Sequence, residues 1–230
     1  MVDERSEVGQ GTAVLCSGGL DSVVLAVHEA TRGAVQLVYV VAGLAWEPAE
    51  QRAMAGLLES GVFGAHARPL VRLAVDMRDV YPDSHWAVRG EPPSYHTADE
   101  DVYLEGRNIV LLAKASVFCA RHDLARLAIG PLAGNPFPDA TPEFFAAMAK
   151  ALSLGLAYRL TIDAPFAALH KEDVIRMGAS LGVPLELTLS CMNPKEDLHC
   201  GQCSKCRERH DAFIEAGLED ATRYAGPLPR

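Results

Sequence analysis

The stretch that most constrains the fold runs from Ala13 to Ser22 and reads AVLCSGGLDS. Four apolar residues, typical of a buried strand, lead into Ser-Gly-Gly, and the apolar run that begins at Leu20 is typical of a buried helix. A strand, a glycine turn and a helix start point several backbone N–H groups at one place, where the helix dipole adds positive potential. The stretch therefore predicts a cradle for phosphate or pyrophosphate, with an ordinary strand–helix turn as the alternative.

The rest of the chain alternates strand and helix patterns. Periodicity predicts strands over 12–16, 35–41, 68–75, 127–130 and 158–162, and helices over 20–31, 48–60, 108–122, 142–154, 171–181 and 204–216. This order favours parallel strands joined by right-handed crossovers, so we expect an α/β fold with a five-stranded parallel sheet. Residues 76–105 show little periodicity, and we expect a long active-site loop there with one short helix near 76–80.

Four of the six cysteines lie close together near the C-terminus with the spacing C-x8-C-x2-C-x2-C. They are Cys191, Cys200, Cys203 and Cys206. Four thiolates at such spacing predict a closed, structural Zn²⁺ site. An iron–sulfur cluster and four unrelated buried thiols are the alternatives. His199 adjoins a ligand but is surplus to the four, so we expect it to lie in the second shell or in solvent.

Charge and composition exclude some classes of function. The chain has 230 residues and a net charge of −9, which argues against a broad nucleic-acid surface. It holds no apolar stretch long enough to span a membrane. The first residues, MVDERSEVGQG, are polar and acidic, so we expect a loose leader over 1–10 and no export signal. The cytoplasm is then the expected location, where the cysteines serve as thiols or metal ligands rather than in disulfides.

Three landmarks now stand in order: SGGLDS at 17–22, GRN at 106–108, and the cysteine-rich tail that ends CRERHDAF. Together they resemble the QueC-type 7-cyano-7-deazaguanine synthase family of PP-loop ATP pyrophosphatases, over about residues 12–216. The resemblance implies a Rossmann-like, adenine nucleotide alpha hydrolase-like (HUP) sheet over 11–188. It also implies a small zinc-binding helical appendage over 189–230.

The resemblance further implies an ATP-dependent reaction. Members of this family adenylate the carboxylate of 7-carboxy-7-deazaguanine, let ammonia displace AMP to give an amide, and dehydrate the amide to a nitrile with a second ATP. Carried over by position, the residues that would hold the pyrophosphate of ATP are Ser17, Gly18, Gly19, Asp21 and Ser22. Asp21 would be the Mg²⁺ ligand of this loop, Arg107 would face the nucleotide, and Lys171 would stabilise the leaving pyrophosphate. The alternative interpretation of Arg107 is an ordinary surface arginine, and that of Lys171 is an exposed lysine at a helix start.

Two loops depart from the pattern of the family. After its second strand the family carries Tyr-Gly-Gln-Arg-His, but residues 41–47 read VAGLAWE, in which only the glycine is kept. After its fourth strand the family carries Ser-Gly-Tyr-Pro-Asp-Cys-Arg, but residues 133–141 read AGNPFPDAT. We therefore expect a divergent member with a different acceptor, held by Asn135, Phe137, Asp139 and Trp46. Trp46 and Phe137 are predicted either to stack a planar base or to pack within their loops.

Two other functions stay open at this point. A sulfur-inserting enzyme of the same fold would thiolate a purine-like base and needs a nucleophilic sulfur, for which Cys119 is the candidate. A small buried hydrophobe is the alternative interpretation of that cysteine. A non-enzymatic nucleotide-binding module is the third hypothesis. The expected partners are ATP, a purine- or deazapurine-like small molecule, ammonia or a sulfur donor, and a second copy of the chain in a homodimer.

Overall fold

The computed structural model describes residues 11–229 and contains one parallel five-stranded sheet. The strand order is β3-β2-β1-β4-β5. The strands are β1 Thr12–Leu15, β2 Val35–Val41, β3 Ala67–Ala74, β4 Arg126–Ala128 and β5 Thr161–Asp163. The chain runs outward from β1 in one direction to β3 and then returns to the other side of β1, so a topological switch point lies between β1 and β4. Ligands of open α/β sheets bind at the carboxyl ends of the strands at such a point. The predicted leader over 1–10 lies outside the described residues.

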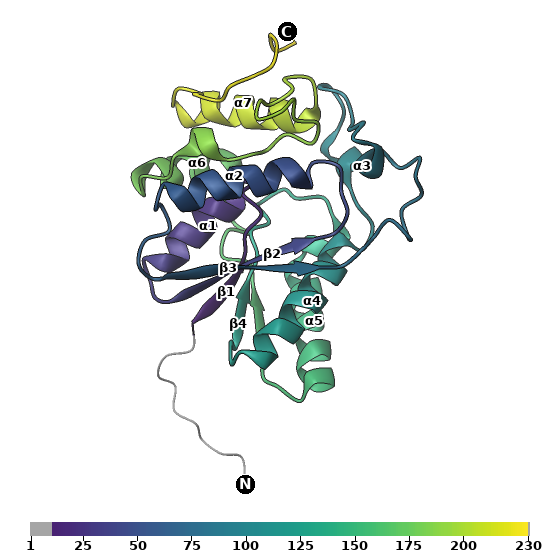
Figure 1. Cartoon of the computed structure of the whole chain (residues 1–230), viewed down its shortest axis with the longest axis vertical. Coiled ribbons are helices and arrows are strands. Elements are labelled where there is room, and N and C mark those ends of the chain that lie inside the picture. Colours follow the sequence, from purple (N-terminus) through teal and green to yellow (C-terminus); the bar gives the residue numbers. More distant parts are fainter. Residues whose placement is uncertain (1–10, 230) are drawn as a thin grey trace.

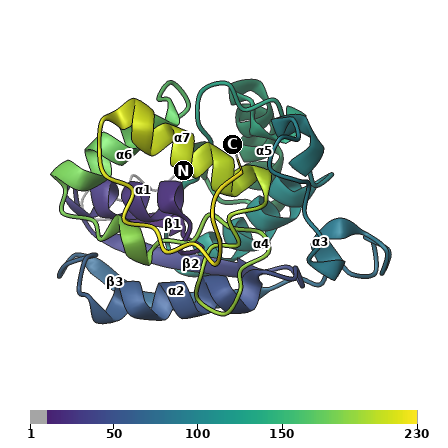
Figure 2. The same ribbon diagram turned by 90° about the horizontal axis from the view of Figure 1, so that it is seen from above.

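Helices cover both faces of the sheet (Figures 1 and 2). They are α1 Leu20–Ala30, α2 Glu47–Glu59, α3 Trp86–Arg89, α4 Arg107–Arg121, α5 Pro142–Leu156, α6 Lys171–Ser180 and α7 Ser204–Ala216. The alternating pleat of β2 divides the core, because Leu37 packs with Met54 and Leu57 whereas Val38 packs with Leu112 on the other face. Helices α1, α2 and α6 therefore lie on one face, with α7 outside them, and α4 and α5 lie on the other.

The long loop between β3 and α4 differs from the prediction at one point. A helix near 76–80 is wrong, because Val80 and Tyr81 only close a single turn onto the Met77 carbonyl. Pro82 then disfavours helical geometry at the residue before it. The loop instead contains α3, which begins where the His85 side chain accepts a hydrogen bond from the Ala87 N–H, and a short 3-10 helix over Asp99–Val102.

The fifth strand begins later than predicted. Helix α5 continues to Leu156 and ends on Ala157 in the left-handed region, with φ 46°. The Ser153 hydroxyl then holds the backbone N–H and the carbonyl of Leu160, so pairing with β4 starts only at Thr161. The predicted run over 158–162 is thus shifted to Thr161–Asp163.

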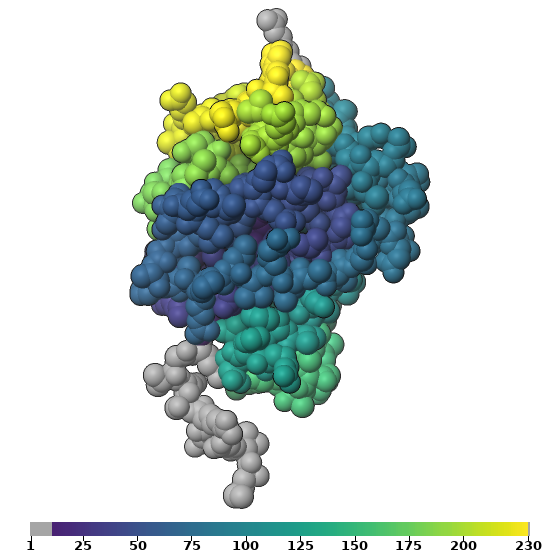
Figure 3. Space-filling view, in the orientation of Figure 1, coloured from purple at the N-terminus to yellow at the C-terminus, as the bar shows by residue number. Residues whose placement is uncertain are grey.

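The C-terminal segment after residue 188 packs on the helical face that carries α2 and α6. Figure 3 shows this segment, yellow to green, against α2 in blue. Its first residue, Leu189, donates its N–H to the Gly18 carbonyl at 2.9 Å. The segment is therefore bonded to the glycine turn itself. No helix within residues 11–229 is long and apolar enough to cross a membrane.

Candidate functional site

The glycine turn between β1 and α1 is closed by its own serines. The Ser17 N–H donates to Ser22 Oγ at 3.2 Å, Ser22 Oγ donates to the Gly19 carbonyl at 2.9 Å, and the Gly19 N–H donates to Ser17 Oγ at 3.3 Å. Gly18 has φ +87°, and a Cβ there would meet the Glu50 carbonyl oxygen at 3.0 Å, so glycine is required. The first turn of α1 has no intrahelical acceptors for its N–H groups, so the turn can offer them to an anion.

Lys171 reaches this turn from the start of α6. Its Nζ lies 2.6 Å from Asp21 Oδ2 and 3.2 Å from Glu208 Oε1 of α7. Burial lowers the pKa of Lys171, but the two carboxylates outweigh burial and hold that pKa above its ordinary value. The other oxygen of Asp21, Oδ1, is buried without a hydrogen-bond partner. A charged ammonium group and a free carboxylate oxygen therefore meet beside the glycine turn.

Two cavities open from the turn. The larger, of about 290 Å³, is walled mainly by apolar side chains from the strand ends and from α4, including Val38, Val40, Leu111, Ile129 and Phe137. The smaller, of about 180 Å³, has six charged side chains in its wall, namely Asp21, Glu50, Arg107, Lys171, Lys205 and Glu208. Ser17, Gly19, Asp21 and Arg107 line both cavities. The arrangement suits a ligand with a flat apolar end and an anionic end.

Arg107 stands between the two cavities as the first residue of α4. Gly106 before it has φ 75°, which lets the chain turn sharply into the helix. The guanidinium carbon lies 5.9 Å from the centre of the Trp46 ring, and Arg107 Nε is buried without a partner. A buried unpaired donor is costly, so this group is poised for an acceptor that a ligand would bring.

The residues predicted to hold the substrate divide between the cavities. The larger one is lined by Asn135, Phe137 and Asp139. The Phe137 ring stacks on Tyr103 with centres 5.1 Å apart. Trp46 lines the smaller cavity and stacks on Trp86 with centres 5.8 Å apart. Since the two rings line different cavities, a single base held between them is not favoured. A contact of either ring with substrate stays a prediction.

Asp139 links its loop to the start of α4 by hydrogen bonds. Its carboxylate accepts the Asn108 N–H at 3.0 Å, and its carbonyl accepts Asn108 Nδ2 at 2.9 Å. The altered loop over 133–141 is thereby fastened to the first turn of α4 next to Arg107. Burial raises the pKa of Asp139. A role of Asp139 toward substrate stays a prediction.

Glu50 and Tyr39 are members of the site that the sequence reasoning missed. The Tyr39 hydroxyl donates to Glu50 Oε2 at 2.8 Å, and the two residues lie on the walls of different cavities. Burial raises the pKa of Glu50 to about 7. One signal was available in the sequence: Glu50 stands four residues before Met54 and seven before Leu57, which places a carboxyl group on the apolar stripe of α2.

Cys119 lies away from both cavities. It is fully buried on α4 within the apolar core, and it lines neither of the two cavities described above. Burial raises the pKa of its thiol to about 12, which disfavours the nucleophilic thiolate. Cys16 does line the larger cavity, but burial raises the pKa of this thiol to about 12 as well.

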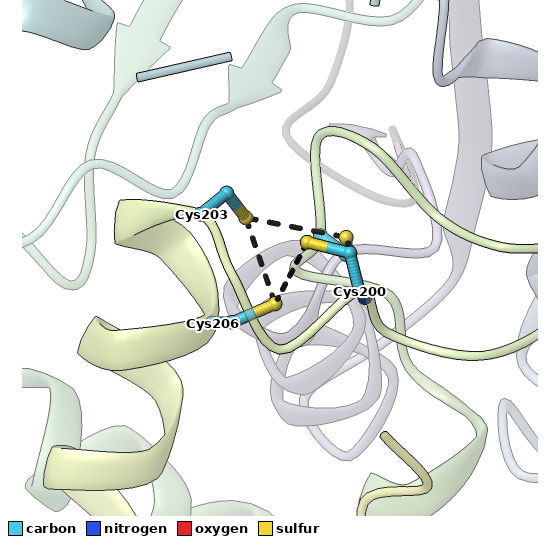
Figure 4. A group of neighbouring side chains, drawn as sticks. Cys200, Cys203 and Cys206 are labelled. Atoms are coloured by element: carbon cyan, nitrogen blue, oxygen red, sulfur yellow. Dashed lines mark hydrogen bonds between the residues drawn. The ribbon is translucent and has the colours of Figure 1, made fainter. Parts of the chain in front are cut away.

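The four clustered cysteines come together around the start of α7, where Figure 4 labels Cys200, Cys203 and Cys206. Their sulfur atoms all lie within 4.8 Å of one another, with Cys200 and Cys206 3.9 Å apart and Cys203 and Cys206 3.5 Å apart. Ligands of a tetrahedral zinc ion at its usual bond length lie about 3.8 Å apart. Backbone N–H groups of Asn193 and Cys200 point at Cys191 Sγ at 3.3 and 3.2 Å. The cluster could therefore bind a metal ion.

His199 lies beside this cluster and is not one of its four members. It is buried, and its Nε2 accepts the Ser190 N–H at 3.0 Å. Burial, aided by Arg209, lowers the pKa of His199 to about 3, so the ring is neutral and free to accept. The structure thus confirms a buried supporting position rather than a position in solvent.

The cluster also anchors the long loop. Arg207 of α7 donates Nη1 to the carbonyls of Tyr95 and Thr97 at 2.7 and 3.0 Å, and its Nη2 lies 3.3 Å from Asp99. Ser94 forms a β-bridge with Cys203. The cysteine-rich segment therefore fixes the predicted active-site loop and, through Leu189, the glycine turn.

Comparison with known proteins supplies relatives for this arrangement. The chain is 36% identical over 228 residues to the 7-cyano-7-deazaguanine synthase of Methanopyrus kandleri, covering 93% of this chain and 98% of the relative. It is 31% identical to the protein of the same name from Koribacter versatilis, over 98% and 97% of the two chains.

The fold also matches a solved structure, a 4-thiouridine synthetase–RNA complex with bound ATP. The TM-score is 0.50 at 13% identity, over 90% of this chain and 52% of that one, so the likeness concerns the fold alone. It confirms the adenine nucleotide alpha hydrolase-like sheet. The family model described as "Queuosine biosynthesis protein QueC" matches residues 12–217. The chain therefore belongs to the QueC family of enzymes.

Proposed function

We propose that this protein cleaves ATP to AMP and pyrophosphate in order to adenylate the carboxylate of a deazapurine- or purine-like acid, which ammonia then attacks. The observation that carries the proposal is that the glycine turn and Arg107 lie on the shared wall of the two cavities, with Lys171 beside them on the wall of the smaller one. Adenosine suits the apolar cavity, and the phosphates suit the turn and the lysine.

The residues of this site match the needs of both half-reactions. A carboxylate oxygen of the acceptor attacks the α-phosphorus, the bond from that phosphorus to its bridging oxygen breaks, and pyrophosphate leaves. The Lys171 ammonium group and the α1 N-terminus stabilise the charge that gathers on the leaving group. Ammonia then attacks the acyl carbon, AMP departs with the electron pair of the carbon–oxygen bond, and one proton leaves the nitrogen.

Two metal ions fit the residues present. Asp21 would hold Mg²⁺ through its unpartnered Oδ1, and a bound Mg²⁺ neutralises charge on the phosphates. The four cysteines would hold Zn²⁺ in a closed structural site, since the spacing of their sulfur atoms suits tetrahedral coordination.

The acceptor is where we propose that this chain differs from its relatives. The loops over 41–47 and 133–141 depart from the pattern of the family and supply Trp46, Asn135 and Phe137 to the cavity walls. Sulfur insertion is a less favoured reaction, because burial of Cys119 leaves that route without an accessible carrier. The homodimer, ammonia as donor and a cytoplasmic location remain predictions.

The test is a product analysis with a panel of acids. The protein is incubated with ATP, Mg²⁺, ammonium and either 7-carboxy-7-deazaguanine or related purine acids, and amide and nitrile products are sought by mass spectrometry. We expect one acid to give a product whose nitrogen comes from labelled ammonium. Lys171→Met should abolish it, while the exposed Lys150→Met should not. A parallel incubation supplies sulfide in place of ammonium; a product that carries sulfur there and disappears in Cys119→Ala would overturn the proposal.

A further inference from the structure

The smaller cavity contains a second lysine, Lys205, which comes from the cysteine-rich segment. It lies on α7 between the cluster members Cys203 and Cys206, and its side chain is 23% exposed. The cavity wall that carries it also carries Ser17, Gly19 and Lys171. Two lysines from different elements therefore face the space above the glycine turn.

Glu208 joins the two lysines. Lys171 Nζ lies 3.2 Å from its Oε1, and Lys205 Nζ contacts its Oε2. One carboxylate thus holds an ammonium group on each oxygen inside the cavity. The pairing differs from the ordinary surface pair of the same spacing in this chain, Arg176 with Asp173, whose side chains are 48% and 43% exposed. Lys205 and Glu208 are shielded, so their charges act more strongly on a neighbouring anion.

We propose that Lys205 is a second pyrophosphate-binding residue, and that Glu208 pairs with Lys205 and Lys171 as a competing anion until the phosphates of ATP arrive. The inference deepens the proposed function and rests on it. It means that the cysteine-rich segment supplies a residue to the nucleotide site rather than only supporting the fold. The hydrogen bond from the Leu189 N–H to the Gly18 carbonyl fixes this segment against the turn, so the position of Lys205 relative to the turn is set.

Replacing Lys205 and replacing Glu208 should change the affinity for pyrophosphate in opposite directions. Lys205→Met removes a cation from the path of the β- and γ-phosphates and should weaken their binding. Glu208→Gln keeps the shape but removes the negative charge that competes with the phosphates, and should tighten it. AMP lacks those two phosphates, so its affinity should change in neither variant. A mere loss of packing at α7 would not produce this pattern.

The experiment measures binding of inorganic pyrophosphate and of AMP by calorimetry in the metal-loaded protein. We expect Lys205→Met to weaken pyrophosphate binding roughly tenfold, the usual effect of losing one charge-assisted contact. Lys205→Arg should restore most of the loss, and Glu208→Gln should tighten binding several-fold. Lys195→Met, at an exposed lysine of the same segment, is the matched control and should change nothing.

The outcomes separate this inference from the proposed function. Should wild-type protein bind no pyrophosphate, the proposed function itself fails. Should Lys171→Met lose pyrophosphate binding while Lys205→Met equals the Lys195→Met control, only the role of Lys205 is overturned. Equal weakening of AMP and pyrophosphate in Lys205→Met would assign the residue a structural role and would also overturn it.

Discussion

Replacing Glu50 by Gln should make the protein more stable than wild type, by a margin that grows as the pH rises. Glu50 is 7% exposed, and its carboxyl group accepts a hydrogen bond from the Tyr39 hydroxyl, which a glutamine oxygen can also accept. Burial raises the pKa of Glu50 from 4.5 to about 7. The folded state therefore keeps a proton that the unfolded state releases between these two values.

The size of the effect follows from that pKa difference. Because the folded pKa is the higher one, stability is greatest at low pH and falls as pH rises through about 4.5 to about 7, at about 1.4 kcal/mol per unit. The whole loss is about 3 kcal/mol in wild type. Glutamine carries no charge, so Glu50→Gln does not undergo this loss of stability. Between about pH 5.5 and about pH 8 the free energy of unfolding of the variant should gain about 2 kcal/mol on that of wild type.

Urea unfolding followed by circular dichroism measures this difference at several pH values. Working above about pH 5.5 limits protonation of the four clustered cysteines, which would otherwise release any metal that they bind. Glu59→Gln, at an exposed position of the same helix, is the matched control for removing one glutamate charge. A difference between Glu50→Gln and wild type that stays flat, or that shrinks as pH rises, would refute the reasoning.

Four further predictions follow from the contacts described above. Gly18→Ala should destabilise the protein by about 1–2 kcal/mol, the cost of a left-handed residue with a side chain, and should abolish ATP binding in a calorimetric titration. Arg207→Met should speed amide hydrogen exchange over residues 93–99 while leaving exchange in β1 unchanged. Cys119→Ala should cost ~1 kcal/mol in urea unfolding and leave the rate of nitrogen insertion unchanged. A chelator should remove one zinc per chain and lower Tm in calorimetry. It should also speed amide hydrogen exchange over residues 93–99, because the long loop pairs with the cysteine-rich segment.

Local signals made much of this site predictable from the sequence. The glycine turn at 17–22 and the cysteine cluster at 191–206 are each formed by residues close together in the sequence, so both can be recognised from the sequence alone. All five strands were predicted, most clearly β1 and β2, because buried parallel strands are continuous apolar runs. Their ends were less predictable: β5 starts late because a serine hydroxyl of α5, on Ser153, captures the backbone of Leu160.

The cavity walls could not be predicted in the same way. Tyr39 and Glu50 become partners only when β2 and α2 pack, and Lys205 meets Lys171 only when α7 lies on α6. The expected helix near 76–80 is wrong because apolar residues there close a single turn before Pro82. Whether Phe137 and Trp46 can stack one planar base between them also depends on tertiary packing; in the structure the two rings stack on Tyr103 and Trp86.

The most direct test of the account is which bond of ATP breaks. Phosphorus NMR of a reaction with ATP, Mg²⁺, ammonium and the panel of acids distinguishes the two possible cleavages. The glycine turn, with Lys171 held beside Asp21, predicts AMP and pyrophosphate in equal amounts. ADP and inorganic phosphate as the products would contradict the account.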